Sequence, residues 1–158
     1  MAMETGEKAP DFEAVMDNGE KFRLSEFIKN TNLVLYFYPK DETPGCTKEA
    51  CVFRDNFSSL KEVGGEVIGI SADPPESHAK FREHHNLQFR LISDPGNKIR
   101  ELFKLKHFLI PQRITFVIDQ SGTIRGVFES QIHPAAHAEF AQKVLREICG
   151  AKETTVKS

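Results

Sequence analysis

The chain has 158 residues, of which 39% are hydrophobic and 28% charged, and its formal net charge is -2. This length suits one domain that buries a core without disulfides or metal ions, and the balanced charge gives no reason to expect a nucleic-acid or membrane partner. No apolar run approaches the roughly 20 residues of a membrane span. Residues 1–10 lack an apolar signal core, so we expect a cytoplasmic protein, or an organellar one if a transit peptide has been removed.

The first elements are predicted from short apolar runs and the turn between them. Residues 12–16 and 21–24 alternate in polarity around Asn18-Gly19, which predicts an N-terminal β-hairpin. Ser25 is placed to cap a short helix that ends near Ile28. The unbroken apolar run 33–38 predicts a central strand covered on both faces.

Helical and strand patterns then alternate along the chain. From Thr47 onward apolar residues recur every three or four positions, which predicts a helix that ends before Gly64-Gly65. The remaining patterns predict strands at 67–70 and 89–92, helices at 77–84 and 97–103, a hairpin of 113–118 with 123–128, and a final helix over 133–149.

This order predicts an α/β fold of thioredoxin type, with a mixed central β-sheet and helices on both faces. The N-terminal hairpin joins the same layered arrangement. We expect a single domain over residues 1–150 and a flexible polar tail over 151–158.

The three cysteines are too few, and too odd in number, for a secreted disulfide framework. Cys46 lies where a buried strand and a Pro/Gly-containing loop lead into a helix, and Cys51 follows five residues later. A helix start favours a thiolate, and a nearby second thiol can trap an oxidised first one. The pattern indicates thiol redox chemistry.

A reactive thiol at Cys46 needs more than a helix end. Lowering a thiol pKa by about two to three units requires roughly 3–4 kcal/mol of thiolate stabilisation, whereas a helix end supplies about 0.3–2 kcal/mol. A charged or donating partner is therefore expected, and the candidates are Arg113, Arg54 and Thr43. Gly45 leaves space beside the sulfur, so that the chain can approach closely.

The spacing of the two thiols poses a geometric problem. Residues five apart on an ideal helix have Cα atoms about 8–9 Å apart and point roughly 140° from each other, but a disulfide needs Cα atoms within about 7 Å. Cys46 and Cys51 can therefore bond only if the first helical turn unwinds. The alternative for Cys51 is a buried helix thiol with a packing role.

The segment from Pro39 to Cys46 matches the Pro-x-x-x-Thr-x-x-Cys signature of the peroxiredoxins. With Cys51 five residues beyond, the chain resembles the bacterioferritin comigratory protein or peroxiredoxin Q subgroup, from about Lys8 through the final helix. The resemblance implies that Cys46 is the peroxidatic cysteine, that Cys51 is the resolving cysteine, and that the two form a transient disulfide.

The resemblance also implies roles for neighbouring residues. Thr43 is expected to bond the peroxide and the sulfur, Pro39 and Gly45 to line the substrate pocket, and Arg113 to polarise the peroxide and favour the thiolate. It further implies thioredoxin or a similar dithiol as reductant, and a monomer. We find no motif for a metal, flavin or haem and expect no cofactor.

The expected activity is a thiol-dependent peroxidase that reduces hydrogen peroxide and organic hydroperoxides to water and alcohols. Its intermediates would be a cysteine sulfenic acid and an intramolecular disulfide. The alternative is a general thiol-disulfide oxidoreductase or a redox-regulated binding protein. Such proteins typically carry Cys-x-x-Cys, which is narrower than the spacing of Cys46 and Cys51.

Three further features invite a functional interpretation. His133 and His137 are spaced to share a metal ion on one helix face, but a solvated helix start is the favoured interpretation. Cys149 falls on an apolar helix face and is expected to be buried and inert, with an intermolecular or regulatory thiol as the alternative. The apolar residues 108–110 are assigned to the core in preference to a pocket wall or dimer patch.

Overall fold

The computed structural model describes residues 2–106 and 111–157, and side chains up to residue 150. The apolar residues 108–110 therefore lie outside the described part. A mixed sheet with the order β2-β1-β5-β4-β3-β6-β7 runs through the described residues. Its strands are β1 (Glu13–Met16), β2 (Lys21–Arg23), β3 (Asn32–Phe37), β4 (Gly65–Ser71), β5 (Arg90–Ser93), β6 (Ile114–Ile118) and β7 (Ile124–Glu129).

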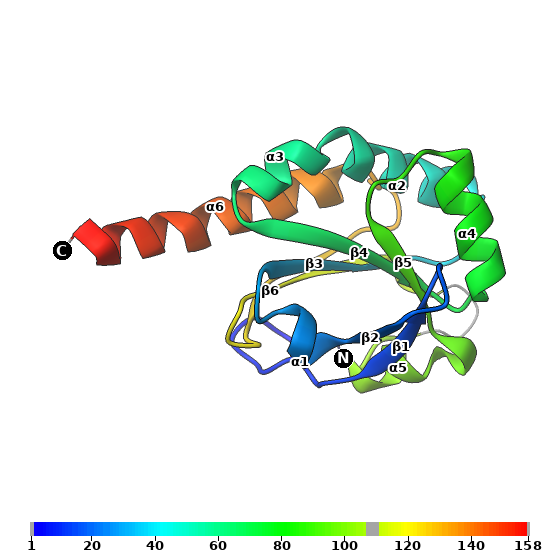
Figure 1. Ribbon diagram of the computed structural model, residues 1–158, viewed down its shortest axis with the longest axis horizontal. Helices are drawn as coiled ribbons and strands as arrows, with labels where there is room; N and C mark the ends of the chain where they lie inside the picture. Colours follow the sequence, from blue (N-terminus) through cyan, green and yellow to red (C-terminus); the bar gives the residue numbers. More distant parts are fainter. Residues whose placement is uncertain (1, 107–110, 158) are drawn as a thin grey trace.

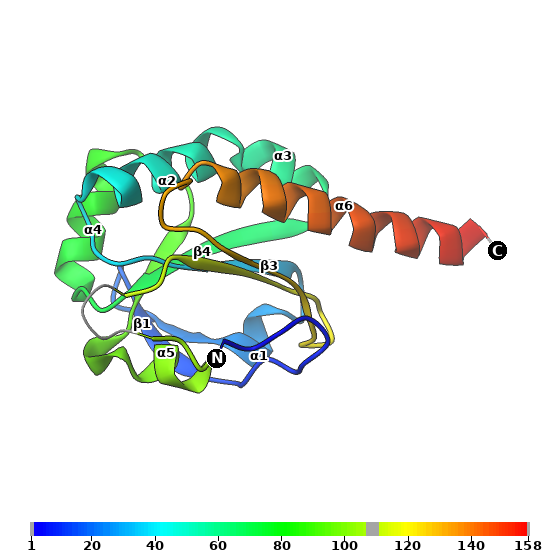
Figure 2. The same ribbon diagram turned by 180° about the vertical axis from the view of Figure 1, so that it is seen from behind.

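Helices cover both faces of this sheet, as the sequence predicts (Figures 1 and 2). One face carries α2, α3, α4 and α6, and the other carries α1 and α5. None of the described helices is long and apolar enough to span a bilayer. The helices are α1 (Leu24–Phe27), α2 (Pro44–Asp55), α3 (Phe57–Glu62), α4 (Pro75–His84), the 3-10 turn η1 (Pro95–Asn97), α5 (Lys98–Leu102) and α6 (Ala136–Lys157).

The central strand β3 is buried along its whole length because its side chains alternate between two cores. Leu33, Leu35 and Phe37 pack with apolar residues of α1 and α5. Val34 and Tyr36 pack with apolar residues of α2, α3, α4 and α6. Strand β3 pairs in parallel with β4 and antiparallel with β6. The last residues of β4 and the first residues of β6 therefore lie beside the end of β3, where the next loop begins.

The helix predicted from Thr47 to just before Gly64-Gly65 starts too late and misses a break, although its predicted end agrees with the end of α3 at Glu62. Helix α2 already begins at Pro44, because a proline is favoured in the first helical turn and Thr43 before it is extended, with φ -85° and ψ 151°. The helix then ends at Asp55, and Asn56, with φ -106° and ψ 8°, separates α2 from α3. The Asn56 side-chain amide donates to the Val52 carbonyl at 2.8 Å.

Two other helix predictions need correction. Ser25 does not cap α1; instead, the Asp11 carboxylate accepts bonds from the Ser25 backbone N–H and hydroxyl, both at 2.9 Å. Helix α6 starts three residues later than predicted, and its backbone stays helical through Lys157. The backbone of residues 151–157 thus continues α6, and the flexibility expected of the tail over 151–158 stays a prediction.

Helix α6 approaches β7 closely at Gly126. A Cβ atom added there would lie 2.8 Å from the Phe140 ring and 2.8 Å from a Val144 methyl group, closer than such atoms normally approach. The absence of a side chain at Gly126 thus sets the distance between α6 and the sheet.

Gly126→Ala is expected to destabilise the protein by about 1–3 kcal/mol, because the new methyl group overpacks the interface between β7 and α6. Urea denaturation measures the change. Gly150→Ala is the control, since a Cβ at Gly150 meets nothing within 4 Å and alanine is the better helix former by up to about 1 kcal/mol. Equal stability of Gly126→Ala and the parent protein would contradict this close packing.

Candidate active site

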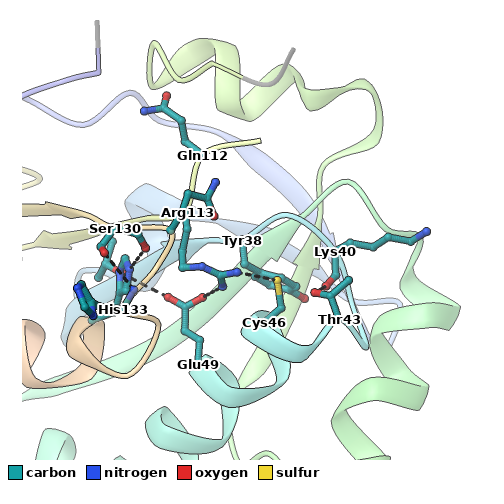
Figure 3. A network of polar contacts seen from close by, with 12 residues as sticks. Tyr38, Lys40, Thr43, Cys46, Glu49, Gln112, Arg113, Ser130 and His133 are labelled. Atoms are coloured by element: carbon teal, nitrogen blue, oxygen red, sulfur yellow. Dashed lines mark hydrogen bonds and ion pairs between the residues drawn. The ribbon is translucent and has the colours of Figure 1, made fainter. Parts of the chain in front are cut away.

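The loop after β3 turns into α2 so that Cys46 is the third residue of the helix (Figure 3). The first helical hydrogen bond runs from the Thr47 N–H to the Thr43 carbonyl at 2.8 Å. The N–H groups of Gly45 and Cys46 precede this bond and have no acceptor within the helix. The cysteine therefore lies inside the positive first turn of α2, whereas a helix starting at Thr47 would have left it just before the first turn.

The Cys46 sulfur is enclosed, with only 1% of the residue exposed. Arg113 Nη2 donates to the sulfur at 3.5 Å, as Figure 3 shows. The register of the sheet explains this contact: Ile114 pairs with Phe37 at the end of β3, so Arg113 lies beside the loop that carries Cys46. Of the three partners predicted for the thiol, Arg113 is the one that contacts it.

Gly45 makes room for the guanidinium. A Cβ atom at Gly45 would lie 2.9 Å from Arg113 Nη2, too close for an undisturbed side chain. Gly45 also lines a surface groove of about 650 Å³ with Pro44 and Lys48 of α2 and with residues 132–136. Pro39 is half-buried at the start of the same loop.

Glu49, one turn after Cys46, holds the other side of the guanidinium. Arg113 Nη1 donates to Glu49 Oε1 at 2.7 Å, and both side chains are buried. Burial opposes the charge of Arg113, but the charges of Glu49 and Cys46 outweigh it and raise the pKa of Arg113. The guanidinium therefore stays protonated and bridges a sulfur and a carboxyl group away from water.

A second arginine, Arg100, ties the two sides of the site together. Its side chain is fully buried and donates to the Tyr38 carbonyl at 2.7 Å and to the Gln112 carbonyl at 2.8 Å. These carbonyls directly precede Pro39 and Arg113. Burial lowers the pKa of Arg100 to about 10, which leaves the group cationic at neutral pH.

Asp41 links the loop between β3 and α2 to helix α4. Its carboxylate accepts bonds from the Tyr38 hydroxyl at 2.6 Å and the Ser77 hydroxyl at 2.7 Å, and lies 2.8 Å from His78 Nδ1. The Asp41 N–H donates to Asp73 at 2.9 Å. Because Ser77 and His78 belong to α4, this network joins the loop to a second helix.

The other predicted partners have different contacts. The Thr43 hydroxyl donates to the Lys40 carbonyl at 2.9 Å, although Thr43 and Arg113 flank Cys46 in Figure 3. Arg54 is wrong as a partner of the sulfur, since it bonds Asp55 at 3.0 Å and the His85 carbonyl at 2.8 Å.

Cys46 and Cys51 are both free thiols within α2, and Cys51 is half-buried. This arrangement is the helical geometry in which the two sulfurs cannot bond. Cys149, predicted as buried, is only half-buried on α6.

The prediction of a solvated helix start for the two histidines is correct for one of them. His133 is exposed and precedes α6, but His137 is completely buried. The sequence interpretation also missed Glu49 and Arg100. A carboxylate among the apolar positions of a helix was the available signal for Glu49. Nothing in the short segment around Arg100 distinguished it from a surface arginine.

Comparison with known proteins supports the same chemistry. Residues 5–127 match the model of the AhpC/TSA family. The chain is 41% identical over 146 residues to the chloroplastic peroxiredoxin Q of Populus jackii, covering 90% of this chain and 68% of that protein. It is 46% identical over 132 residues to peroxiredoxin Bcp of Bacillus subtilis, covering 78% and 83%.

Solved structures agree in fold. Peroxidoxin BcpB of Mycobacterium tuberculosis superposes with a TM-score of 0.88 at 38% identity, over 92% of this chain and 98% of that one. Peroxiredoxin Q of Xanthomonas campestris superposes with a TM-score of 0.79 at 26% identity, over 87% and 91%. With its reduced thiol held between a helix start and a buried arginine, the chain belongs to the AhpC/TSA family, within the group of peroxiredoxin Q and Bcp proteins.

Proposed function

We propose that this thiol-dependent peroxidase uses Cys46 as the attacking thiolate and Cys51 as the resolving thiol. The observation that carries the assignment is the contact of Arg113 with the Cys46 sulfur at 3.5 Å. A cation that donates to sulfur favours the thiolate, which is the nucleophilic form. The same guanidinium can also bind an oxygen atom next to the sulfur.

In the first step the Cys46 thiolate attacks the terminal oxygen of the peroxide. A sulfur–oxygen bond forms, the oxygen–oxygen bond breaks, and the leaving oxygen takes up a proton to give water or an alcohol. Arg113 and the free N–H groups of the first turn of α2 stabilise the charge that develops on the oxygens. Thr43 would serve by turning its hydroxyl from Lys40 to the bound peroxide.

In the second step the Cys51 thiol attacks the sulfenic sulfur, a disulfide forms, and water leaves. The first turn of α2 must unwind, because both sulfurs lie in one regular helix. A dithiol reductant then restores both thiols. Thioredoxin is the reductant that we propose, since an exposed disulfide in an unwound segment is accessible to a protein dithiol.

The oligomeric state, the localisation and the range of substrates are also proposals. We propose that the enzyme acts as a monomer, as the resemblance to the peroxiredoxin Q subgroup implies. We place it in the cytoplasm or in an organelle; the names of the plant relatives call them chloroplastic.

A structure of a Xanthomonas relative is titled for alkyl peroxide reduction, which supports organic hydroperoxides beside hydrogen peroxide as substrates. A general disulfide oxidoreductase is disfavoured, because the enclosed Cys46 admits a small oxidant more readily than a protein disulfide.

Cys46→Ser is expected to abolish peroxide consumption with thioredoxin and thioredoxin reductase. Cys51→Ser should still consume one equivalent of peroxide and form a sulfenic acid on Cys46, detected by dimedone trapping and mass spectrometry. Cys149→Ser is the control and should turn over normally. Peroxide turnover by Cys46→Ser, or a disulfide from Cys46 to Cys149 in the oxidised parent protein, would refute these roles.

Arg113→Ala is expected to slow the reaction of Cys46 with hydrogen peroxide by about 10²–10³-fold, the range for removing a donor that stabilises developing charge. Arg113→Lys should recover part of the rate, because it keeps the charge but loses the two-pronged geometry. Stopped-flow kinetics measure the rates. Arg54→Ala, on the same helix as Cys46, is the control that should react like the parent, and an equal loss in both alanine variants would count against Arg113.

Gly45→Ala tests the approach of the guanidinium without changing its chemistry. The added methyl group should displace Arg113 and lower the peroxide rate by about tenfold, as small misplacements of catalytic groups do. Alanine is a better helix former than glycine, which offsets part of the cost of moving the guanidinium, so the variant should stay folded; a thermal melt checks this. An unchanged rate would show that the position of Arg113 does not depend on this space.

A further inference from the structure

His137 lies in a fully buried position at the start of α6, next to the site but not in contact with the sulfur. Its Nε2 atom is 2.9 Å from the Ser130 carbonyl oxygen. A carbonyl only accepts hydrogen bonds, so Nε2 must carry a hydrogen. Its Nδ1 atom is 2.8 Å from the Thr115 hydroxyl and 3.5 Å from Glu49 Oε2. The ring thus contacts Ser130 through Nε2, and Nδ1 lies close to both the Thr115 hydroxyl and Glu49.

The imidazole is neutral under physiological conditions. Burial lowers the pKa of His137 to about 4, with the charge of Arg113 acting in the same direction and the Ser130 bond opposing them. Because the single ring hydrogen is on Nε2, Nδ1 presents a lone pair. The Thr115 hydroxyl therefore donates to Nδ1, and the same lone pair faces the Glu49 carboxyl group.

Glu49 has one oxygen bound and one oxygen free. Oε1 accepts from Arg113, whereas Oε2 finds no hydrogen-bond partner among the described residues although it is buried. An anionic Oε2 would repel the Nδ1 lone pair, but a protonated Oε2 could donate to it. Burial raises the pKa of Glu49 to about 8 against the opposing charge of Arg113. The other titratable groups near Glu49 are Tyr36 on β3 and Cys46 on α2.

We propose that His137 is a positioning residue for the peroxidase reaction: its imidazole, fixed by Ser130 and Thr115, holds the Glu49 carboxyl group in the orientation that aims Arg113 at the Cys46 sulfur. The chain of contacts runs from α6 through α2 to the edge of β6, as Figure 3 shows for Ser130, Glu49, Arg113 and Cys46. This inference rests on the proposed function of Cys46.

Two amide variants separate positioning from packing. His137→Asn keeps a polar atom near Nδ1, toward Glu49 and Thr115, but loses the bond to Ser130. His137→Gln keeps an N–H near Nε2, toward Ser130, but loses the group that faces Glu49. If the imidazole orients Glu49, the asparagine variant should retain most of the rate and the glutamine variant should lose it. If the imidazole only holds the segment around Ser130 in place, the glutamine variant should retain most of the rate and the asparagine variant should lose it.

The experiment measures the second-order rate constant of Cys46 with hydrogen peroxide by stopped flow as a function of pH, together with the melting temperature. We expect a loss of about tenfold in His137→Gln, equivalent to a coupling of about 1.4 kcal/mol. The double variant Glu49→Gln, His137→Gln should be no slower than Glu49→Gln alone, because the histidine acts through the carboxyl group.

Several results would overturn the proposal. These are an unchanged rate and pH profile in His137→Gln, a greater loss in His137→Asn than in His137→Gln, and independent, multiplicative losses in the double variant. Should His137→Gln not fold, Thr115→Val replaces it. Removing the hydroxyl that fixes Nδ1 should slow the reaction if the imidazole orients Glu49, and leave it unchanged otherwise. If the parent protein itself does not react at Cys46, the proposed function fails instead.

Discussion

The site depends on one buried cation that has two partners. The Arg113 guanidinium donates to the Cys46 sulfur from one nitrogen and to Glu49 from another. A buried charge without partners is costly, and charge-assisted hydrogen bonds to a sulfur and a carboxyl group offset that cost. The carboxyl group therefore makes it possible to keep a guanidinium inside the protein, and the guanidinium in turn makes a reactive sulfur possible there.

The fold provides this geometry through elements distant in sequence. Cys46 and Glu49 come from the first turns of α2, and Arg113 comes from the edge of β6. The antiparallel register of β3 and β6 sets them side by side, and Arg100 bonds both backbone segments that lead into the site. Asp41 adds a connection to α4. Strand β3 and helices α2, α4 and α5 are thus all bonded to or continuous with the loop that precedes Cys46, and Arg113 at the edge of β6 bonds the sulfur itself.

Much of this could be predicted from local patterns. The strands, the hairpins and the position of Cys46 follow from apolar runs, Asn-Gly turns and the loop motif, and Arg113 was named in advance. Glu49 and Arg100 were not named, and His137 was assigned to a solvated helix start, because the roles of all three come from burial, which depends on contacts between distant segments. The break at Asn56 was also missed, since the apolar period of the helix continues unchanged across it.

That break has a mechanical consequence. Helix α3 packs on β4, with Leu60 fully buried, whereas α2 is a separate unit of 12 residues. In a single long helix, unwinding of the first turn would strain a helix whose far end is held against β4. With a break at Asn56, α2 can unwind from Pro44 while α3 stays packed on β4. Local opening tends to follow the boundaries of cooperative units. The unwinding proposed for disulfide formation would thereby leave the packing of α3 on the sheet unchanged.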